Sequence, residues 1–244
     1  MHASPIEPGY LITKESGMYY ENDLLTQKLS ARSISFYPAC DTLLYKADVK
    51  YMVCDDILYQ VDHTLSKTMI ARTETRTPAR TVWLGLAVDD SLTDLENISF
   101  YLDFPNLTES YEYLFLLPCT EWSAGGTPIR MEPGIYEKSR LPEEYTRAFF
   151  RSYDVMSVID KEVMELYNKH FLRVSQPVPL NEVDKEPLPK ALSSCFGERV
   201  REKMQEKLVW VKIVFPAHFT PEILEELHAG INICLLYTSP SPRD

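Results

Sequence analysis

The sequence predicts a β-rich α+β fold, with antiparallel strands in the first ~130 residues and mixed helices and strands after them. Short apolar segments of strand length, separated by turn residues, crowd the first part of the chain. Helix starts and apolar residues at helical spacing are concentrated in the later part. Hydrophobic residues make up 45% of the 244 residues, which is enough to bury a sizeable core and excludes a wholly disordered chain.

The early strands are indicated by alternation and by one tight turn. Apolar residues alternate with serines in Ser33–Tyr37, the period of two that is typical of a half-buried strand. Val49–Val53 and Ile57–Val61 flank Cys54-Asp55-Asp56, which predicts a hairpin with an acidic turn. Further elements are expected as strands at Tyr10–Thr13, Met18–Tyr20 and Thr68–Arg72, and as a loop at Thr73–Arg80.

The middle of the chain predicts a central strand and a second, half-exposed one. Thr81–Val88 is apolar on both faces, which indicates a strand covered on both sides. In Ile98–Phe104 large apolar residues alternate with polar ones, so one face is expected to be wet, formed by Ser99, Tyr101 and Asp103.

A short helix and a hairpin are expected to follow. Thr108 should cap the helix and Pro118 should end it, with Tyr111, Leu114 and Phe115 on one side. The hairpin spans Glu121–Ile129 and turns at Gly125-Gly126.

Helices are expected in the later part. Asp154 is placed to cap a helix that runs to about Lys169, because apolar residues recur after it at helical spacing. Gln176–Pro189 holds four prolines and is expected to be a loop, and Glu198–Lys207 is expected to be a charged helix.

Leu208–Phe215 is the strongest strand signal in the chain. Thr220-Pro221-Glu222 has the residues of a helix start, and Gly230 is expected to end that helix. A further strand should open at Ile231. Together these elements predict a β-α-β unit whose two strands lie parallel in one sheet.

The segments group into three parts. Residues 1–132 form the expected β-rich domain, and residues 133–233 form an α/β segment that is expected to continue into a missing C-terminal part. The tail Cys234–Asp244 resembles the translation of a transposase-type sequencing adapter and is expected to be an artefact. Met1 is followed at once by prolines and extended residues, as if it were an internal methionine of a longer reading frame.

Charge and hydropathy exclude several classes of function. The formal net charge is −11, which argues against a nucleic-acid-binding domain and against docking on anionic lipid. No apolar run reaches the ~18–20 residues of a membrane span, and the start of the chain does not resemble a signal peptide. The cysteines form no C-x-x-C and are expected to be reduced and mostly buried.

No motif points to catalysis, a cofactor or a metal. The scarce glycines allow no phosphate-binding or nucleophile-elbow pattern. His170 and His228 are expected near helix ends, where a positive charge suits the helix dipole. The adjacent pairs Asp55-Asp56 and Asp89-Asp90 are expected to make turns rather than acid–base pairs. The sequence therefore assigns no catalytic, cofactor-binding or metal-ligating residue.

The tryptophans leave one binding hypothesis open. Trp83 and Trp210 lie within apolar strands and are expected in the core, whereas Trp122 stands beside a turn and is the surface candidate. A ligand- or carbohydrate-binding β-rich domain is therefore the alternative to a structural role, and an enzyme whose site forms only in the fold is a third class.

Four segments carry a resemblance to a known family. They are Asp48-Val49-Lys50-Tyr51, Val82–Leu86 with Leu95–Asp103, Leu208–Pro216, and Ile231-Asn232. They resemble strand motifs of TssF (also called ImpG or VasA), a baseplate subunit of the bacterial type VI secretion system, in a form similar to that of Bacteroidetes. The motif residues are Trp83, Gly85, Trp210, Phe215, Pro216 and Asn232.

The resemblance implies a structural protein without catalysis or cofactors. Two TssF copies and one TssG form a wedge of the phage-tail-like baseplate. That wedge contacts TssK, the sheath-initiating TssE and the VgrG hub. The implied location is the cytoplasm, assembled at the inner-membrane face, with neither nucleic acid nor direct membrane insertion involved.

Overall fold

The computed structural model describes residues 10–13, 18–20, 34–38, 42–73, 75, 77–108, 110–134, 168–231 and 236–238. Among these residues 42% lie in strands and 16% in helices, and the sheets are antiparallel, which confirms the β-rich α+β class. The chain divides into two compact units, Met1–Lys46 with Asn232–Asp244, and Ala47–Ile231. No helix of the described residues is long and apolar enough to cross a membrane.

The smaller unit contains two small antiparallel sheets. In one, β1 (Tyr10–Ile12) pairs with β4 (Thr42–Leu44). In the other, β3 (Ile34–Pro38) lies between β2 (Met18–Tyr20) and β17 (Leu236–Thr238).

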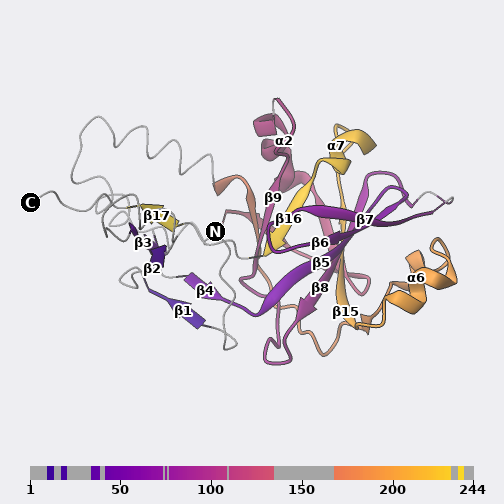
Figure 1. Ribbon diagram of the computed structural model, residues 1–244, viewed down its shortest axis with the longest axis horizontal. Coiled ribbons are helices and arrows are strands. Elements are labelled where there is room, and N and C mark those ends of the chain that lie inside the picture. The colour runs from indigo at the N-terminus through magenta and orange to yellow at the C-terminus, as the bar shows by residue number, and fades with distance from the viewer. Residues whose placement is uncertain are drawn as a thin grey trace, which may run out of the picture. The chain divides into compact units, whose positions relative to one another are not determined.

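The larger unit is built around an eight-stranded antiparallel sheet (Figure 1). Its order is β11-β10-β15-β8-β5-β6-β7, and β14 pairs with β15 beside this path. The strands are β5 (Ala47–Cys54), β6 (Ile57–Val61), β7 (Lys67–Arg72), β8 (Thr81–Val88), β10 (Glu121–Ala124), β11 (Thr127–Ile129), β14 (Lys185–Glu186) and β15 (Leu208–Val214).

A four-stranded antiparallel sheet packs on one face of the large sheet. Its order is β12 (Met131–Pro133), β13 (Phe171–Val174), β9 (Ser99–Asp103) and β16 (His228–Ile231). The two sheets bury apolar side chains between them, and the Phe100 and Trp122 rings meet there with centroids 4.8 Å apart. Burial of this apolar layer between the two sheets is the main contribution to the stability of such a sandwich.

The second face of the large sheet is covered by the segment that holds α5 (Lys190–Ser193) and α6 (Glu198–Lys203). Figure 1 shows α6 beside β15. The buried cluster there consists of Val53, Leu58, Leu188, Leu192, Phe196, Met204, Leu208 and Trp210. The central strand β8 is thus covered on both faces, which explains its continuous apolar sequence.

Aromatic rings close one end of the sandwich. Phe219 contacts Phe104, Tyr113 and Phe215, with ring centroids 4.9–5.8 Å apart. Tyr113 comes from α2 (Ser110–Leu116), which continues into the 3-10 turn η1 (Leu117–Cys119). Phe219 precedes α7 (Pro221–Glu225), the short helix that leads from β15 toward β16.

Most expected strands are confirmed. The hairpin β5–β6 turns at Asp55-Asp56, where Asp55 has a φ of 50°. β8 has the expected limits and lies between β5 and β15. The β10–β11 hairpin turns at Gly125-Gly126, and both glycines have a positive φ that most residues avoid.

The predicted β-α-β unit is wrong. β16 pairs antiparallel with β9 in the small sheet and does not join the sheet of β15. The connection through α7 therefore passes from one layer of the sandwich to the other. Gly230 is a residue of β16, and the helix ends earlier, at Glu225.

One expectation about exposure is also wrong. The expected wet face of β9 is less exposed than the alternation indicates, since Ser99 is 2% exposed and Tyr101 and Asp103 are half-buried. On α2 only Leu114 is buried, while Tyr111 and Phe115 are 49% and 57% exposed. Alternation identified the two sides of β9 but not the burial of Ser99 on the polar side.

Some expectations concern residues outside the described ones. These are the helix over residues 154–167, residues 234–235 and 239–244 of the tail, and the motif residue Asn232. The boundary expected near residue 132 lies inside the unit Ala47–Ile231, because β15 pairs with β8 and β13 pairs with β9 across it.

Candidate functional site

The family-like motif residues meet at the centre of the large sheet. Trp210 of β15 lies directly opposite Gly85 of β8 in the strand register, and Lys212 lies opposite Trp83. A Cβ atom on Gly85 would stand 3.0 Å from two ring carbons of Trp210, so the indole occupies the space that glycine leaves. Trp210 is 4% exposed, and its Nε1 donates a hydrogen bond to the Glu186 carbonyl at 3.0 Å.

Trp83 is less enclosed than Trp210. It is half-buried, and the Lys212 ammonium lies 5.8 Å from its ring centroid. Its Nε1 is buried and has no hydrogen-bond partner among the described residues. Trp122, the surface candidate, is 3% exposed between the two sheets and is therefore a core residue.

The remaining motif residues anchor neighbouring elements. Phe215 is 2% exposed and belongs to the aromatic cluster around Phe219, whose backbone N–H donates to the Pro216 carbonyl. Lys50, at the bulge of β5, forms an ion pair with Glu206 beyond α6. These contacts fix the helical cover and one end of the sandwich to the large sheet.

The outer face of the small sheet holds a buried arginine. Arg173 of β13 is 7% exposed and donates to Glu132 at 2.8 Å and to Asn97 at 3.0 Å. Its Nε is buried without a partner among the described residues. A charge in this position is stabilised only through such pairing. The sequence interpretation missed Arg173, although a single charge inside the apolar run Phe171–Val174 could have indicated it.

Two histidines lie at the end of the same sheet. His170 donates through Nδ1 to the Leu102 carbonyl at 3.0 Å, and that nitrogen is 3.4 Å from an Asp103 carboxylate oxygen. His228 belongs to β16 opposite Asp103, so the expected helix-capping position of His228 is wrong. Burial lowers the pKa of His228, and the nearby Lys67 lowers it further.

Lys67 links the edge of the large sheet to α7. Its ammonium donates to the Glu225 carbonyl at the helix end and lies 5.2 Å from the Tyr59 ring centroid. Burial lowers the pKa of Lys67. Burial also raises the pKa of Tyr59 and of the fully buried Cys54 thiol, each to about 12. A thiol of that kind is not a nucleophile at neutral pH.

The acidic pairs act in turns, as expected. Asp89 accepts hydrogen bonds from the backbone and side chain of Ser91 at 3.1 and 2.7 Å. Asp90 is fully exposed and pairs with Lys185 at 3.1 Å. Asp56 accepts the Thr73 backbone N–H through its own carbonyl, which joins the β5–β6 turn to the loop after β7.

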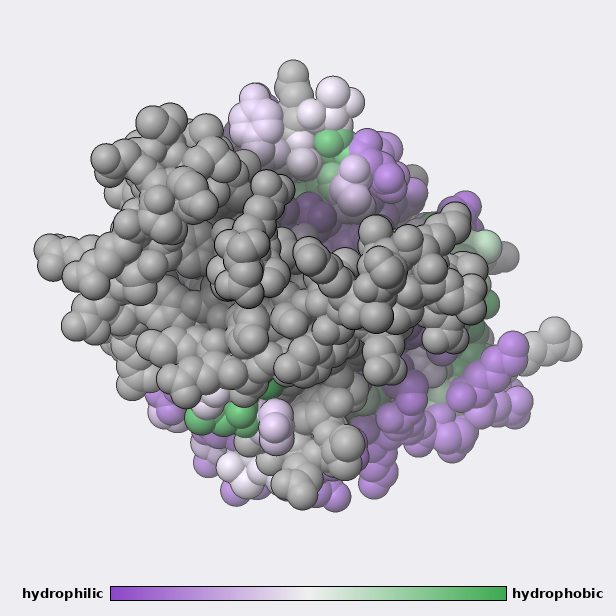
Figure 2. All heavy atoms as spheres, turned by 60° about the vertical axis from the view of Figure 1, so that its left-hand side comes forward, coloured by the Kyte–Doolittle hydropathy of each residue, from purple (hydrophilic) through white to green (hydrophobic). Residues whose placement is uncertain are grey.

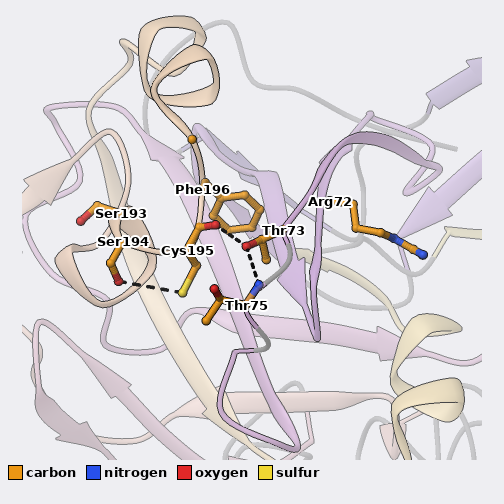
Figure 3. A pocket seen from close by; sticks show the side chains of 8 residues that line it. Arg72, Thr73, Thr75, Ser193, Ser194, Cys195 and Phe196 are labelled. Carbon is orange, nitrogen blue, oxygen red and sulfur yellow. Dashed lines mark hydrogen bonds between the residues drawn. The ribbon is translucent and has the colours of Figure 1, made fainter.

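An open pocket of about 660 Å³ lies where β7 ends (Figure 3). Its lining residues are Arg72, Thr73, Thr75, Ser193, Ser194, Cys195, Phe196 and Gly197. The Thr73 hydroxyl donates to the Cys195 carbonyl and accepts from the Thr75 backbone N–H at 3.1 Å. Figure 3 shows the Arg72 guanidinium at the side of this pocket and directed away from Cys195.

Within the described part of the chain, no group of three His, Cys, Asp or Glu side chains is placed to hold a metal ion. The pocket contains hydroxyls and one thiol, but no described histidine or carboxylate lines it to activate them. In Figure 2 the described residues visible at the surface are mostly hydrophilic, and hydrophobic ones occupy small separate areas.

Comparison with protein-family models, with curated proteins and with solved structures found no match for this chain.

Proposed function

We propose that this chain is a structural component of a type VI secretion baseplate, a wedge subunit similar to TssF. One observation supports this most. Val82–Leu86 and Leu208–Pro216, which carry the resemblance, are far apart in the sequence but adjacent in the sheet, and Trp210 fills the space above Gly85. The motif residues thus cooperate in packing, as residues that define a scaffold should.

The polar chemistry also favours a scaffold. The buried Arg173 pairs with Glu132 on the neighbouring strand of the small sheet, and Lys67 donates to the carbonyl at the end of α7, so both cations stabilise packing within the fold. In the described residues the strongest pKa shifts belong to Cys54 and Tyr59 and keep both groups protonated at neutral pH. Neither shift prepares a group for acid–base catalysis near pH 7.

The partners follow from the resemblance alone. A second TssF copy and TssG would complete the wedge, and TssK, TssE and the VgrG hub would contact it. Assembly would take place in the cytoplasm at the inner-membrane face. The ligand-binding alternative has less support, because none of the three tryptophans is exposed.

Co-purification with TssG tests this function. The open reading frame that contains this chain is expressed with the TssG protein of the same genome, and an affinity tag on TssG is used for purification. Native mass spectrometry should find two copies of the chain for each TssG. The proposal fails if the chain is folded by circular dichroism but does not co-purify, while another protein of that genome forms the two-to-one complex.

A further inference from the structure

The two sheets of the larger unit have edge strands that differ in how well they are protected against pairing with a strand of another chain. Among the described residues, β11 and β12 are three-residue edges that contain Pro128 and Pro133, and β16 is a four-residue edge. β7 is an edge of six residues without proline. Short length and proline prevent pairing with foreign strands, so β7 is the edge best able to accept one.

The side chains of β7 also suit an added strand. Met69 is 58% exposed beside Tyr59 on one face of the sheet. On the other face, Ile70 and Ala71 pack against the buried cluster that includes Leu192 and Phe196, and this contact holds the strand in place. A bulge near Ile70 shifts the register with β6, but Lys67–Met69 pair with Tyr59–Val61 without interruption.

The pocket lies at the C-terminal end of this edge. Arg72 is the last residue of β7, and Thr73 and Thr75 follow it into the pocket lining. A strand added beside β7 would therefore reach the pocket with one of its ends. Recognition of extended peptides commonly combines main-chain pairing along an edge with pockets that select particular side chains.

Charge selects the class of partner. Arg72 has a side chain 61% exposed, and its described ion pair uses only Nε, at 3.5 Å from Asp56. The terminal guanidinium nitrogens can bind a carboxylate side on. Antiparallel pairing of β7 with β7 of a second copy in full register would place Arg72 opposite Lys67, and like charges opposite each other destabilise a sheet.

We propose that the outer edge of β7 binds an extended segment of another protein by strand addition, with an acidic side chain of that segment facing the Arg72 guanidinium at the C-terminal end of the strand. The inference does not depend on the baseplate assignment. It requires only the outer edge of β7 and the exposed side chains of Met69 and Arg72.

Peptides of defined sequence test the proposal. The probes are two hexapeptides with acetylated and amidated ends. Glu-Thr-Val-Thr-Val-Thr places its glutamate at Arg72 when it pairs antiparallel to β7, and the reversed sequence does so when it pairs parallel. Matched controls carry Gln in place of Glu, or N-methyl groups on every backbone amide. Binding to the full chain is followed by NMR titration and by amide hydrogen exchange.

The proposal predicts slower exchange at β7 amides with one of the glutamate peptides. Arg72→Gln should weaken the binding of that peptide about fivefold, because one charge-assisted pair is lost. The same substitution should leave the binding of the Gln peptide unchanged. Arg130→Gln removes another exposed arginine, next to β12, and should change the binding of neither peptide.

Three results would overturn the proposal. The first is unchanged β7 exchange at saturating peptide, and the second is equal binding by the N-methylated peptide, which cannot pair along the edge. The third is concentration-dependent protection of β7 without any peptide, since that would assign the edge to a second copy of this chain.

Discussion

Replacing Gly85 by alanine tests the packing at the centre of the large sheet. The new Cβ atom would lie 3.0 Å from Cη2 and Cζ2 of Trp210 and 3.1 Å from Cδ1 of Leu208. These neighbours are 4% and 0% exposed, and the Trp210 indole is held by its hydrogen bond to Glu186. The ring therefore has little room to move away from the added methyl group.

The expected loss of stability is about 1–2 kcal/mol. Overpacking a rigid core typically costs about 1–3 kcal/mol. Alanine recovers about 0.5–1 kcal/mol of this, because glycine in a strand loses more conformational freedom on folding. In a Trp210→Phe background the two contacting ring carbons are absent, so the same substitution should become nearly neutral, with a coupling energy of about 1 kcal/mol.

Urea denaturation followed by circular dichroism measures these differences. Gly197→Ala is the matched control, since nothing lies within 4 Å of its new Cβ, and its effect should stay below about 0.5 kcal/mol. If Gly85→Ala is neutral in the wild-type background, or if Trp210→Phe does not relieve it, the contact of Gly85 with Trp210 does not control this packing.

Three further predictions concern buried groups. Trp210→Ala should destabilise the fold by about 3–5 kcal/mol and Trp83→Ala by less, because Trp83 is only half-buried; equal losses in urea melts would contradict this. Glu132→Gln should cost about 1–3 kcal/mol because Arg173 stays buried, whereas the exposed Glu182→Gln should change little; equal small effects would show that the ion pair contributes nothing. Cys54 has a pKa of 9.0 as a free thiol and about 12 in the fold, so the folded state holds its proton longer and stability should fall between pH 9 and 12, at up to about 1.4 kcal/mol per pH unit. Stability curves of wild type and Cys54→Ala should diverge only in that window, and parallel curves would refute the burial effect.

The sequence predicted elements whose signal is local. Thr81–Val88 and Leu208–Phe215 are apolar on both faces because layers cover both sides, and Asp55-Asp56 and Gly125-Gly126 are turn residues by their own chemistry. Gly85 was singled out only as a residue of the family-like motif, and the reason for a glycine there, the indole of Trp210, became visible only in the structure.

Long-range pairing could not be predicted in the same way. Nothing in His228–Ile231 specifies pairing with β9 rather than with β15, since both would bury Ala229. The alternation in β9 identified Ser99 and Tyr101 as one side but not that Ser99 is buried there. For the candidate docking surface, β7 was expected as a strand. Its place at an edge depends on the strand order of the sheet, and the pocket beyond Arg72 depends on the distant residues 193–197.

Sheath assembly in the bacterium that encodes this chain is the most direct test of the proposed baseplate role. A fluorescent sheath protein is imaged before and after deletion of the gene, and the intact gene is then restored on a plasmid. The structural role predicts that sheaths fail to assemble in the deletion strain and return on complementation, because a sheath cannot start without its baseplate. Normal numbers of extending and contracting sheaths in the deletion strain would contradict the account.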